Sequence, residues 1–178
     1  MELNNNIVLI GMPGSGKSYI GKILAERLPD YILLDTDGII EKTQGMTITD
    51  IFEKFSEDYF RKLEYDTIKM VCSGKNKIIS IGGGAFENPD TRNTLLKFGT
   101  VFYLKSDPDV LYNRVSKENT RPLLNNENPK AIMEKLLNKR EQNYQKAHFV
   151  IDTNQSDENE ITDFIIGTIN AANSSCRS

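Results

Sequence analysis

A loop suited to holding a phosphate group lies near the start of the chain. Residues 11–18 read Gly-Met-Pro-Gly-Ser-Gly-Lys-Ser, which matches the pattern G-x-x-x-x-G-K-[S/T] between an apolar run and a helical pattern. Glycines let consecutive backbone N–H groups face an anion, while Lys17 adds a cation and Ser18 a hydroxyl suited to Mg²⁺. A plain glycine-rich turn is the competing interpretation. Because motif and context agree, we predict a site for ATP or GTP. The expected contacts are Gly14, Ser15, Gly16, Lys17, Ser18 and Tyr19.

Polar groups also follow the second and third apolar runs. Asp35 ends the second run and Asp37 follows it, where a carboxylate can order the water shell of Mg²⁺ or accept a proton from an attacking hydroxyl. A polar turn in which Asp37 caps a helix explains either residue equally well. Gly82, Gly83 and Gly84 follow the third run. Consecutive glycines cost conformational entropy and are useful where backbone must approach a ligand, although a plain turn also explains them.

Arginine is scarce, with seven among 22 basic residues, which suggests positions that need a planar, bidentate donor. Arg140 falls on a helical face that Ile132 and Leu136 mark as apolar, where an unpaired guanidinium is costly. Its partner is either an internal carboxylate or the carboxylate of a substrate. Arg61 is followed by Glu64 three residues later, which can fix the guanidinium, although such a pair is often a surface salt bridge.

A polar segment that contains Arg121-Pro122 separates two expected helices. We expect residues 114–127 to form a mobile lid that excludes water and brings Arg121 over the γ-phosphate. Arg114, on the preceding helix, can stack on adenine, and a solvated helix arginine is an equally good interpretation.

Short apolar runs alternate with helical patterns and must position these groups. The expected strands are residues 7–10, 31–34, 77–81, 100–104 and 148–151. The expected helices are residues 18–28, residues 47–71 with a break near Ser56, three that begin at the Asx-Pro pairs 88–89, 107–108 and 128–129, and residues 158–172. We expect Thr47 and Asp50 to form a capping box, and the Asn or Asp of each pair to cap its helix ahead of the proline. This alternation predicts a three-layer α/β fold with a parallel sheet and ligands at the carboxyl ends of the strands.

The composition limits the classes of function. With 178 residues we expect one domain, residues 1–178, with a flexible tail at 173–178. A net charge of −3 argues against a general nucleic-acid or membrane partner. The two cysteines, Cys72 and Cys176, do not suggest a disulfide framework, and we expect a cytoplasmic protein. His148, the single histidine, is expected to be structural.

The motifs GMPGSGKS, DTD, FR-x-x-E, GGG, TRPLL and R-x-x-x-Y, in this order, resemble those of the shikimate kinase family over about residues 5–165. The resemblance implies a P-loop kinase fold with a five-stranded parallel sheet of order 2-3-1-4-5. It also implies an ATP- and Mg²⁺-dependent phosphotransferase that converts shikimate to shikimate 3-phosphate in chorismate and aromatic amino-acid biosynthesis. We expect a monomer.

The resemblance also implies roles for single residues. On the acceptor side, Asp37 is the base and binds the acceptor hydroxyls, within a shikimate-binding region at about residues 35–64. The shikimate carboxylate and ring are bound by Arg61, Arg140 and the backbone of Gly82, Gly83 and Gly84. On the nucleotide side, Lys17 and Arg121 stabilise the transferred phosphoryl group, Ser18 binds Mg²⁺, Asp35 holds it through water, and Arg114 packs on adenine. Ser56 stands where the family usually has glycine, and we expect it to stiffen or shift the turn that aims Arg61.

Other P-loop proteins remain as alternatives. Gluconate kinases share the loop and the size but are expected to lack the triple glycine and FR-x-x-E. A nucleoside monophosphate kinase needs contacts that read a base. A switch GTPase requires an N-K-x-D motif after a strand, and the fourth expected strand leads instead into KSDPD.

Overall fold

The computed structural model describes residues 5–116 and 128–175. Five strands of these residues form one sheet in the order β2-β3-β1-β4-β5, and every neighbouring pair is parallel. The strands are β1 Ile7–Ile10, β2 Ile32–Asp35, β3 Lys77–Ser80, β4 Thr100–Lys105 and β5 Phe149–Asp152. The expected strands and the expected sheet order are confirmed, with strand ends that differ by one residue.

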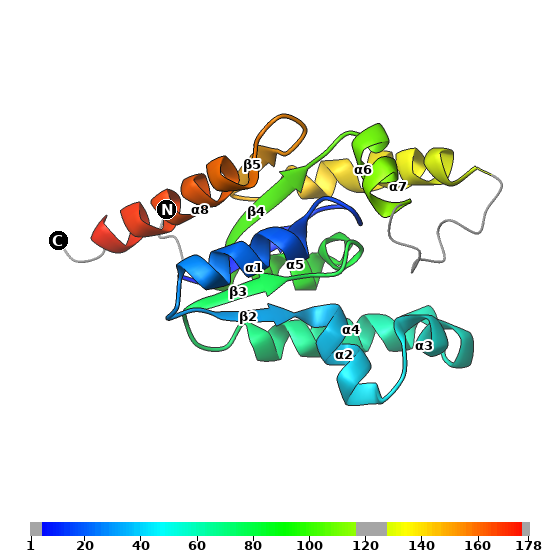
Figure 1. Ribbon diagram of the computed structural model, residues 1–178. Helices are drawn as coiled ribbons and strands as arrows, with labels where there is room; N and C mark the ends of the chain where they lie inside the picture. The colour runs from blue at the N-terminus through cyan, green and yellow to red at the C-terminus, as the bar shows by residue number, and fades with distance from the viewer. Residues whose placement is uncertain (1–4, 117–127, 176–178) are drawn as a thin grey trace.

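Helices cover both faces of this sheet (Figure 1). Their bounds are α1 Lys17–Arg27, α2 Thr36–Gln44, α3 Ile48–Lys54, α4 Glu57–Val71, the 3₁₀ helix η1 Ala85–Glu87, α5 Pro89–Phe98, α6 Pro108–Val115, α7 Pro129–Tyr144 and α8 Glu158–Ser175. The last helix continues three residues beyond the expected end at residue 172. None of the helices in the described chain has the length and apolar composition that a bilayer crossing requires.

A hydrophobic core lies on each face of the sheet, between the strands and the helices that cover them. Isoleucines of α1 and α8, among them Ile20 and Ile165, pack on one face of the sheet with Leu9 of β1. Residues from α4, α5, α6 and α7 pack on the other face around Val8 and Ile10. All four residues of β1 are fully buried, which explains its continuous apolar sequence. The central strand is therefore held on both sides, and its carboxyl end carries the phosphate loop.

Helix starts follow the expected capping chemistry with one exception. The side chains of Asn88 and Asn128 accept hydrogen bonds from backbone N–H groups in the first turns of α5 and α7. Thr47 and Asp50 form the expected capping box of α3. The expectation for Asp107 is wrong in part, because its side chain makes no cap hydrogen bond and α6 begins with a proline alone.

Helix α2 corrects the start of the helical segment after the second strand, which one interpretation placed just after Asp37. Its N-cap is Asp35, whose side chain accepts hydrogen bonds from the N–H groups of Asp37 and Gly38. The alternative in which Asp37 caps the helix is therefore wrong. The predicted break near Ser56 is confirmed, and Ser56 is the N-cap of α4 through a 3.2 Å bond from Tyr59 N.

Candidate active site

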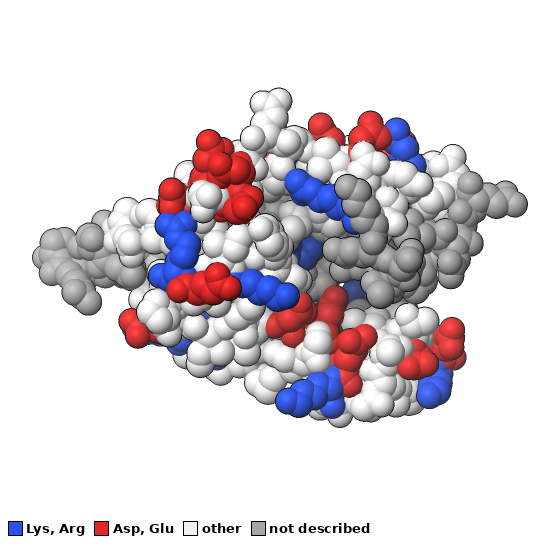
Figure 2. All heavy atoms as spheres, in the orientation of Figure 1, with Lys and Arg blue, Asp and Glu red and all other residues white. Residues whose placement is uncertain are grey.

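A cavity of about 910 Å³ lies at the carboxyl ends of the strands. The phosphate loop forms its middle, and two groups of residues form its ends. One end is lined by Asp35, Asp37, Gly38, Glu41, Ser80, Ile81, Gly82 and Gly83, and the other by Tyr19, Arg114, Thr153, Ser156, Glu158 and Ile161. Figure 2 shows acidic and basic side chains gathered around a hollow on this face of the molecule. A volume of this size is within the range of small-molecule sites.

Two glycines of the phosphate loop adopt a left-handed backbone conformation. Gly14 and Gly16 have φ angles of 82° and 93°, which side chains other than glycine rarely adopt. A β-carbon on Gly14 would also lie 2.6 Å from Val115. Helix α1 begins at Lys17, whose Nζ donates hydrogen bonds of 2.9 Å to the carbonyl oxygens of Gly11 and Met12. The N-terminal end of α1 thus faces the cavity with its positive dipole.

The donor groups of the loop fit a nucleotide phosphate and a hard cation. The Oγ atom of Ser15 is buried and has no hydrogen-bond partner among the described residues, as expected for a group that awaits a ligand oxygen. Ser18 Oγ lies 3.3 Å from Oδ2 of Asp35, at the mouth of the same loop. A hydroxyl and a carboxylate are oxygen donors of the kind that Mg²⁺ prefers, together with phosphate oxygens and water.

The three consecutive glycines lie against the polar side chains of the acceptor end. A β-carbon on Gly82 would lie 2.6 Å from Oδ1 of Asp37. A β-carbon on Gly83 would lie 3.3 Å from Nη1 of Arg140, and one on Gly84 would lie 3.0 Å from both terminal nitrogens of Arg61. Glycine is therefore needed here because the backbone approaches each functional group closely, and the interpretation as a plain turn is insufficient.

Glu64 is a member of this group that the sequence suggested only as a partner of Arg61. Its side chain is 3% exposed, and its Oε2 lies 2.8 Å from Nη1 of Arg61. The exposed Glu57 binds the other terminal nitrogen of Arg61 at 3.1 Å. Burial raises the pKa of Glu64 above its ordinary value, more than the neighbouring Arg61 lowers it. Its burial follows from its place on the inner face of α4, four residues from Phe60 and Ile68.

Arg140 lies half-buried on α7 and points toward the triple glycine. Its Nη1 lies 3.8 Å from the sulfur of Met12. Within the described part of the chain, no carboxylate lies within 4.0 Å of its guanidinium. No direct ion pair thus supports the internal carboxylate that was one alternative for Arg140, but the charge of Arg140 does act on the pKa of the buried Glu64. Binding of a ligand anion by Arg140 stays a prediction.

The opposite end of the cavity is formed by α6 and the start of α8. Arg114 donates hydrogen bonds to the carbonyl oxygens of Thr153, at 3.1 Å, and Gly14, at 3.5 Å, so the interpretation as a purely solvated arginine is wrong. The exposed Tyr19 lies with its hydroxyl 3.5 Å from Oε1 of Glu158. Sequence reasoning missed Thr153 and Glu158, because no motif marks them.

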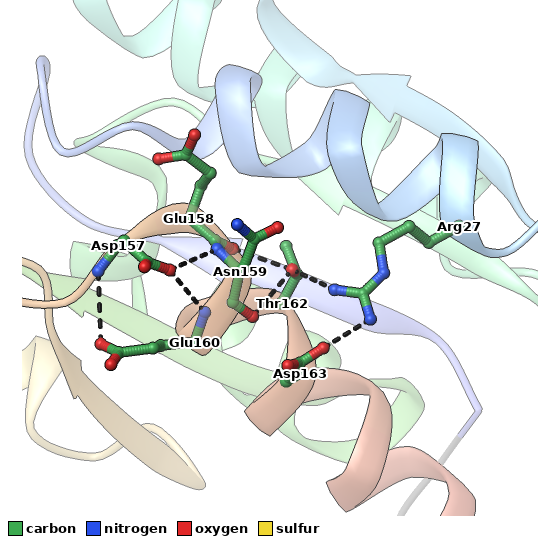
Figure 3. A network of polar contacts seen from close by, with 7 residues as sticks. All are labelled: Arg27, Asp157, Glu158, Asn159, Glu160, Thr162 and Asp163. Carbon is green, nitrogen blue, oxygen red and sulfur yellow. Dashed lines mark hydrogen bonds and ion pairs between the residues drawn. The ribbon is translucent and has the colours of Figure 1, made fainter.

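The first turns of α8 are fixed by the polar network in Figure 3. Asp157 Oδ1 accepts hydrogen bonds from the N–H groups of Asn159 and Glu160. Arg27, at the end of α1, donates to Thr162 and Asp163 at 2.5 Å each. This network holds α8 against the helix that carries the phosphate loop, so the wall containing Glu158 has a fixed position.

Two groups of predicted residues stand apart from the cavity lining. The first group lies next to the cavity, beyond Gly83, and does not line it. Its members are Arg61, Gly84 and Arg140. Arg121 and most of the predicted lid lie outside the described residues. All the other predicted site residues line the cavity.

The chain is similar in sequence to known proteins of one family. The family model for shikimate kinase matches residues 13–170. The shikimate kinase of Thermodesulfovibrio yellowstonii is 40% identical over 161 residues, which cover 90% of this chain and 92% of its own. The shikimate kinase of Rhizobium leguminosarum bv. trifolii is 41% identical over 148 residues, 83% of this chain and 75% of its own.

Solved structures that resemble this chain also include shikimate kinases. Shikimate kinase from Acinetobacter baumannii, in complex with shikimate, superposes with a TM-score of 0.87 at 36% identity, covering 96% of this chain and 95% of that one. A gluconokinase from Sinorhizobium meliloti 1021 covers 99% of this chain with a TM-score of 0.64. Its identity is 15%, so that likeness concerns the fold alone.

Proposed function

The chain belongs to the shikimate kinase family, whose members are ATP-dependent kinases acting on a hydroxyl group, and from this premise we propose that its acceptor is shikimate. The reaction transfers the γ-phosphoryl group of ATP to the 3-hydroxyl group and releases ADP. One observation carries the proposal: a carboxylate and two guanidinium groups meet bare backbone at Gly82–Gly84, beside the phosphate loop. Shikimate offers a matching carboxylate and hydroxyl groups.

In this proposal the acceptor end holds shikimate by its two kinds of polar group. Arg61 and Arg140 bind the carboxylate, since a guanidinium pairs with a carboxylate through two parallel hydrogen bonds. Asp37 accepts a hydrogen bond from the reacting hydroxyl group and takes its proton as the bond to phosphorus forms. The backbone N–H groups of the triple glycine complete the pocket. Glu64 keeps Arg61 in position through their 2.8 Å contact.

The nucleotide end supplies positioning and charge. Lys17 and Arg121 stabilise the phosphoryl group during transfer, because negative charge spreads over its oxygens. Ser15 and the N–H groups of the loop bind the β-phosphate, while Arg114 and Tyr19 border the base and the ribose. Mg²⁺, when bound, neutralises phosphate charge. Ser18 would be its direct ligand, and Asp35 would hold one of its water molecules.

The proposal also covers the location, the oligomeric state and the partners of the protein. We propose a cytoplasmic monomer of one domain that uses small-molecule ligands, with a shikimate-binding region at about residues 35–64. Neither nucleic acid nor membrane is part of this proposal, since the net charge of −3 offers no general attraction to phosphate backbones.

A coupled assay of ADP release tests the proposal. The protein is mixed with ATP and Mg²⁺, and shikimate, gluconate and a set of nucleoside monophosphates are added in separate reactions. We expect release that depends on shikimate, with kcat/KM at least about 10³-fold above that for gluconate, since an acceptor lacking the matched polar groups leaves buried groups unpaired. Equal rates with gluconate, or none with shikimate, would refute the proposed acceptor.

A further inference from the structure

The last turn of α7 touches both the triple glycine and the phosphate loop. Tyr144 is fully buried, and its hydroxyl donates a hydrogen bond to the carbonyl oxygen of Gly83. The same hydroxyl lies 3.8 Å from the sulfur of Met12, within the phosphate loop. Next to it, Asn143 Nδ2 donates a hydrogen bond of 3.1 Å to Oε1 of Glu87, in η1. Two side chains of one helical turn thus hold both ends of the segment from Gly83 to Glu87.

Arg140 extends from the preceding turn of the same helix. Its Nη1 lies 3.8 Å from the sulfur of Met12, the atom that Tyr144 also contacts. A β-carbon on Gly83 would lie 3.3 Å from that nitrogen. The position of the guanidinium relative to the glycine backbone therefore depends on how α7 is seated against Gly83.

We infer that Tyr144 and Asn143 are positioning residues for the acceptor site, acting through the backbone of Gly83 and through η1 on the placement of Arg140. This inference rests on the proposed function, because the acceptor that they would help to place is shikimate. Neither side chain belongs to the cavity lining. Their effect is therefore on the distance between the arginine of α7 and the main chain that it faces, a quantity to which binding is sensitive.

The structure provides a matched control in Tyr103. Its ring packs on that of Tyr144 with centroids 4.8 Å apart, and it is equally buried. Its hydroxyl, however, donates to Oε2 of Glu141 at 2.6 Å and reaches neither Gly83 nor Met12. Tyr103→Phe therefore removes a buried tyrosine hydrogen bond that also joins the core to α7, at Glu141, and keeps both contacts of α7 to the segment from Gly83 to Glu87.

The experiment compares KM values for shikimate and ATP in four proteins: wild type, Tyr144→Phe, Asn143→Ala and Tyr103→Phe. We expect KM for shikimate to rise about tenfold in Tyr144→Phe and about threefold in Asn143→Ala, with KM for ATP within about twofold of wild type. Tyr103→Phe should keep both values. Thermal unfolding of each variant reports the loss of stability separately.

The outcomes separate this inference from the proposed function. If wild type releases no ADP with shikimate, the proposed function fails and takes the inference with it. If wild type is active and Tyr144→Phe has the same KM for shikimate as Tyr103→Phe, only the inference fails. If KM rises equally for shikimate and for ATP in Tyr144→Phe, the substitution has a general structural effect, and the inference is overturned. If Tyr144→Phe gives no folded protein, KM for shikimate in Asn143→Ala decides, because Asn143 is only half-buried. An unchanged value in that variant overturns the inference.

Discussion

Gly82 lies so close to Asp37 that a β-carbon on Gly82 would stand 2.6 Å from Oδ1 of that carboxylate. Oε1 of Glu64 would lie 3.2 Å from the same carbon. Both are ends of flexible side chains, which can move aside without unfolding the protein. In Gly82→Ala we therefore expect a folded protein whose kcat/KM for shikimate is reduced about 10²-fold, because the carboxylate is displaced.

The control for this variant is Gly167→Ala in α8, where a β-carbon meets nothing within 4 Å. Alanine is favoured over glycine inside a helix by up to about 1 kcal/mol, so we expect a slightly raised melting temperature and unchanged kinetics. Steady-state kinetics and thermal unfolding of both variants check the pair. Unchanged kinetics in Gly82→Ala would contradict the importance of this approach.

Asp37→Asn tests the proposed base. The amide keeps the size of the side chain but cannot take up the proton of the hydroxyl group, so kcat should fall about 10²- to 10⁴-fold. ATP binding, measured by calorimetry, should stay within a few-fold of wild type. Asp90→Asn, on the exposed first turn of α5, is the control. Normal turnover in Asp37→Asn would exclude this residue as the base.

Arg140→Lys tests the carboxylate contact. Lysine keeps the charge but cannot form two parallel hydrogen bonds, and a lost bond to a charged group costs about 1.5–3 kcal/mol, or roughly 10- to 150-fold in the Kd for shikimate. Arg27→Lys, which affects the ion pair with Asp163 on the other side of the sheet, should leave that Kd unchanged. An unaltered Kd in Arg140→Lys would mean that Arg140 does not bind the acceptor.

Asp35→Asn separates the metal role of Asp35 from its helix cap. Asparagine caps a helix as well as aspartate does, so α2 should persist by circular dichroism. Loss of the charge beside Ser18 should raise the Mg²⁺ concentration for half-maximal activity about 10- to 100-fold, as for other groups that bind a metal through water. An unchanged Mg²⁺ requirement would argue against this role.

Glu64 should make stability depend on pH. Because burial raises the pKa of Glu64 above its ordinary 4.5, the native protein binds this proton more tightly than the unfolded chain does. Its contribution to the free energy of unfolding is therefore full below pH 4.5 and is lost as pH rises through the raised pKa. We expect the melting temperature of wild type, relative to Glu64→Gln, to fall across that window and to level off above it.

The matched control for this titration is Glu57→Gln, which removes the exposed partner of Arg61. Thermal unfolding from pH 4 to pH 8 is measured for the three proteins in the same buffers. A difference between wild type and Glu64→Gln that stays constant over the whole range would show that Glu64 does not titrate in this way.

Much of the architecture could be predicted because its signals are local. Four consecutive apolar residues at 7–10 predict a doubly buried strand, and Asn88 before a proline predicts the start of α5. The start of α2 at Thr36 was not predicted because Thr36-Asp37-Gly38 has the composition of a turn, and the cap by Asp35 depends on side-chain geometry. His148 was expected to be structural, and its Nδ1 accepts a 2.9 Å hydrogen bond from Val101 N.

The acceptor site was harder to predict than the phosphate loop. The loop is contiguous, so its spacing alone predicts its chemistry. The acceptor site joins Asp37, Glu64, Gly82–Gly84 and Arg140 from four separate segments, and only the packing of α4 and α7 on the sheet brings them together. The motif FR-x-x-E marks Glu64 as a partner of Arg61, but its closeness to Gly82 depends on how α4 packs on the sheet.

The triple glycine also limits how this pocket can change. Its wall is main chain, whose N–H and carbonyl groups stay the same whichever residue is encoded, and any added side chain at residues 82–84 meets Asp37, Arg140 or Arg61. An inhibitor anchored on that wall would leave few escape mutations that preserve catalysis. Substitutions that weaken the binding of such an inhibitor would have to fall on the side chains around the wall.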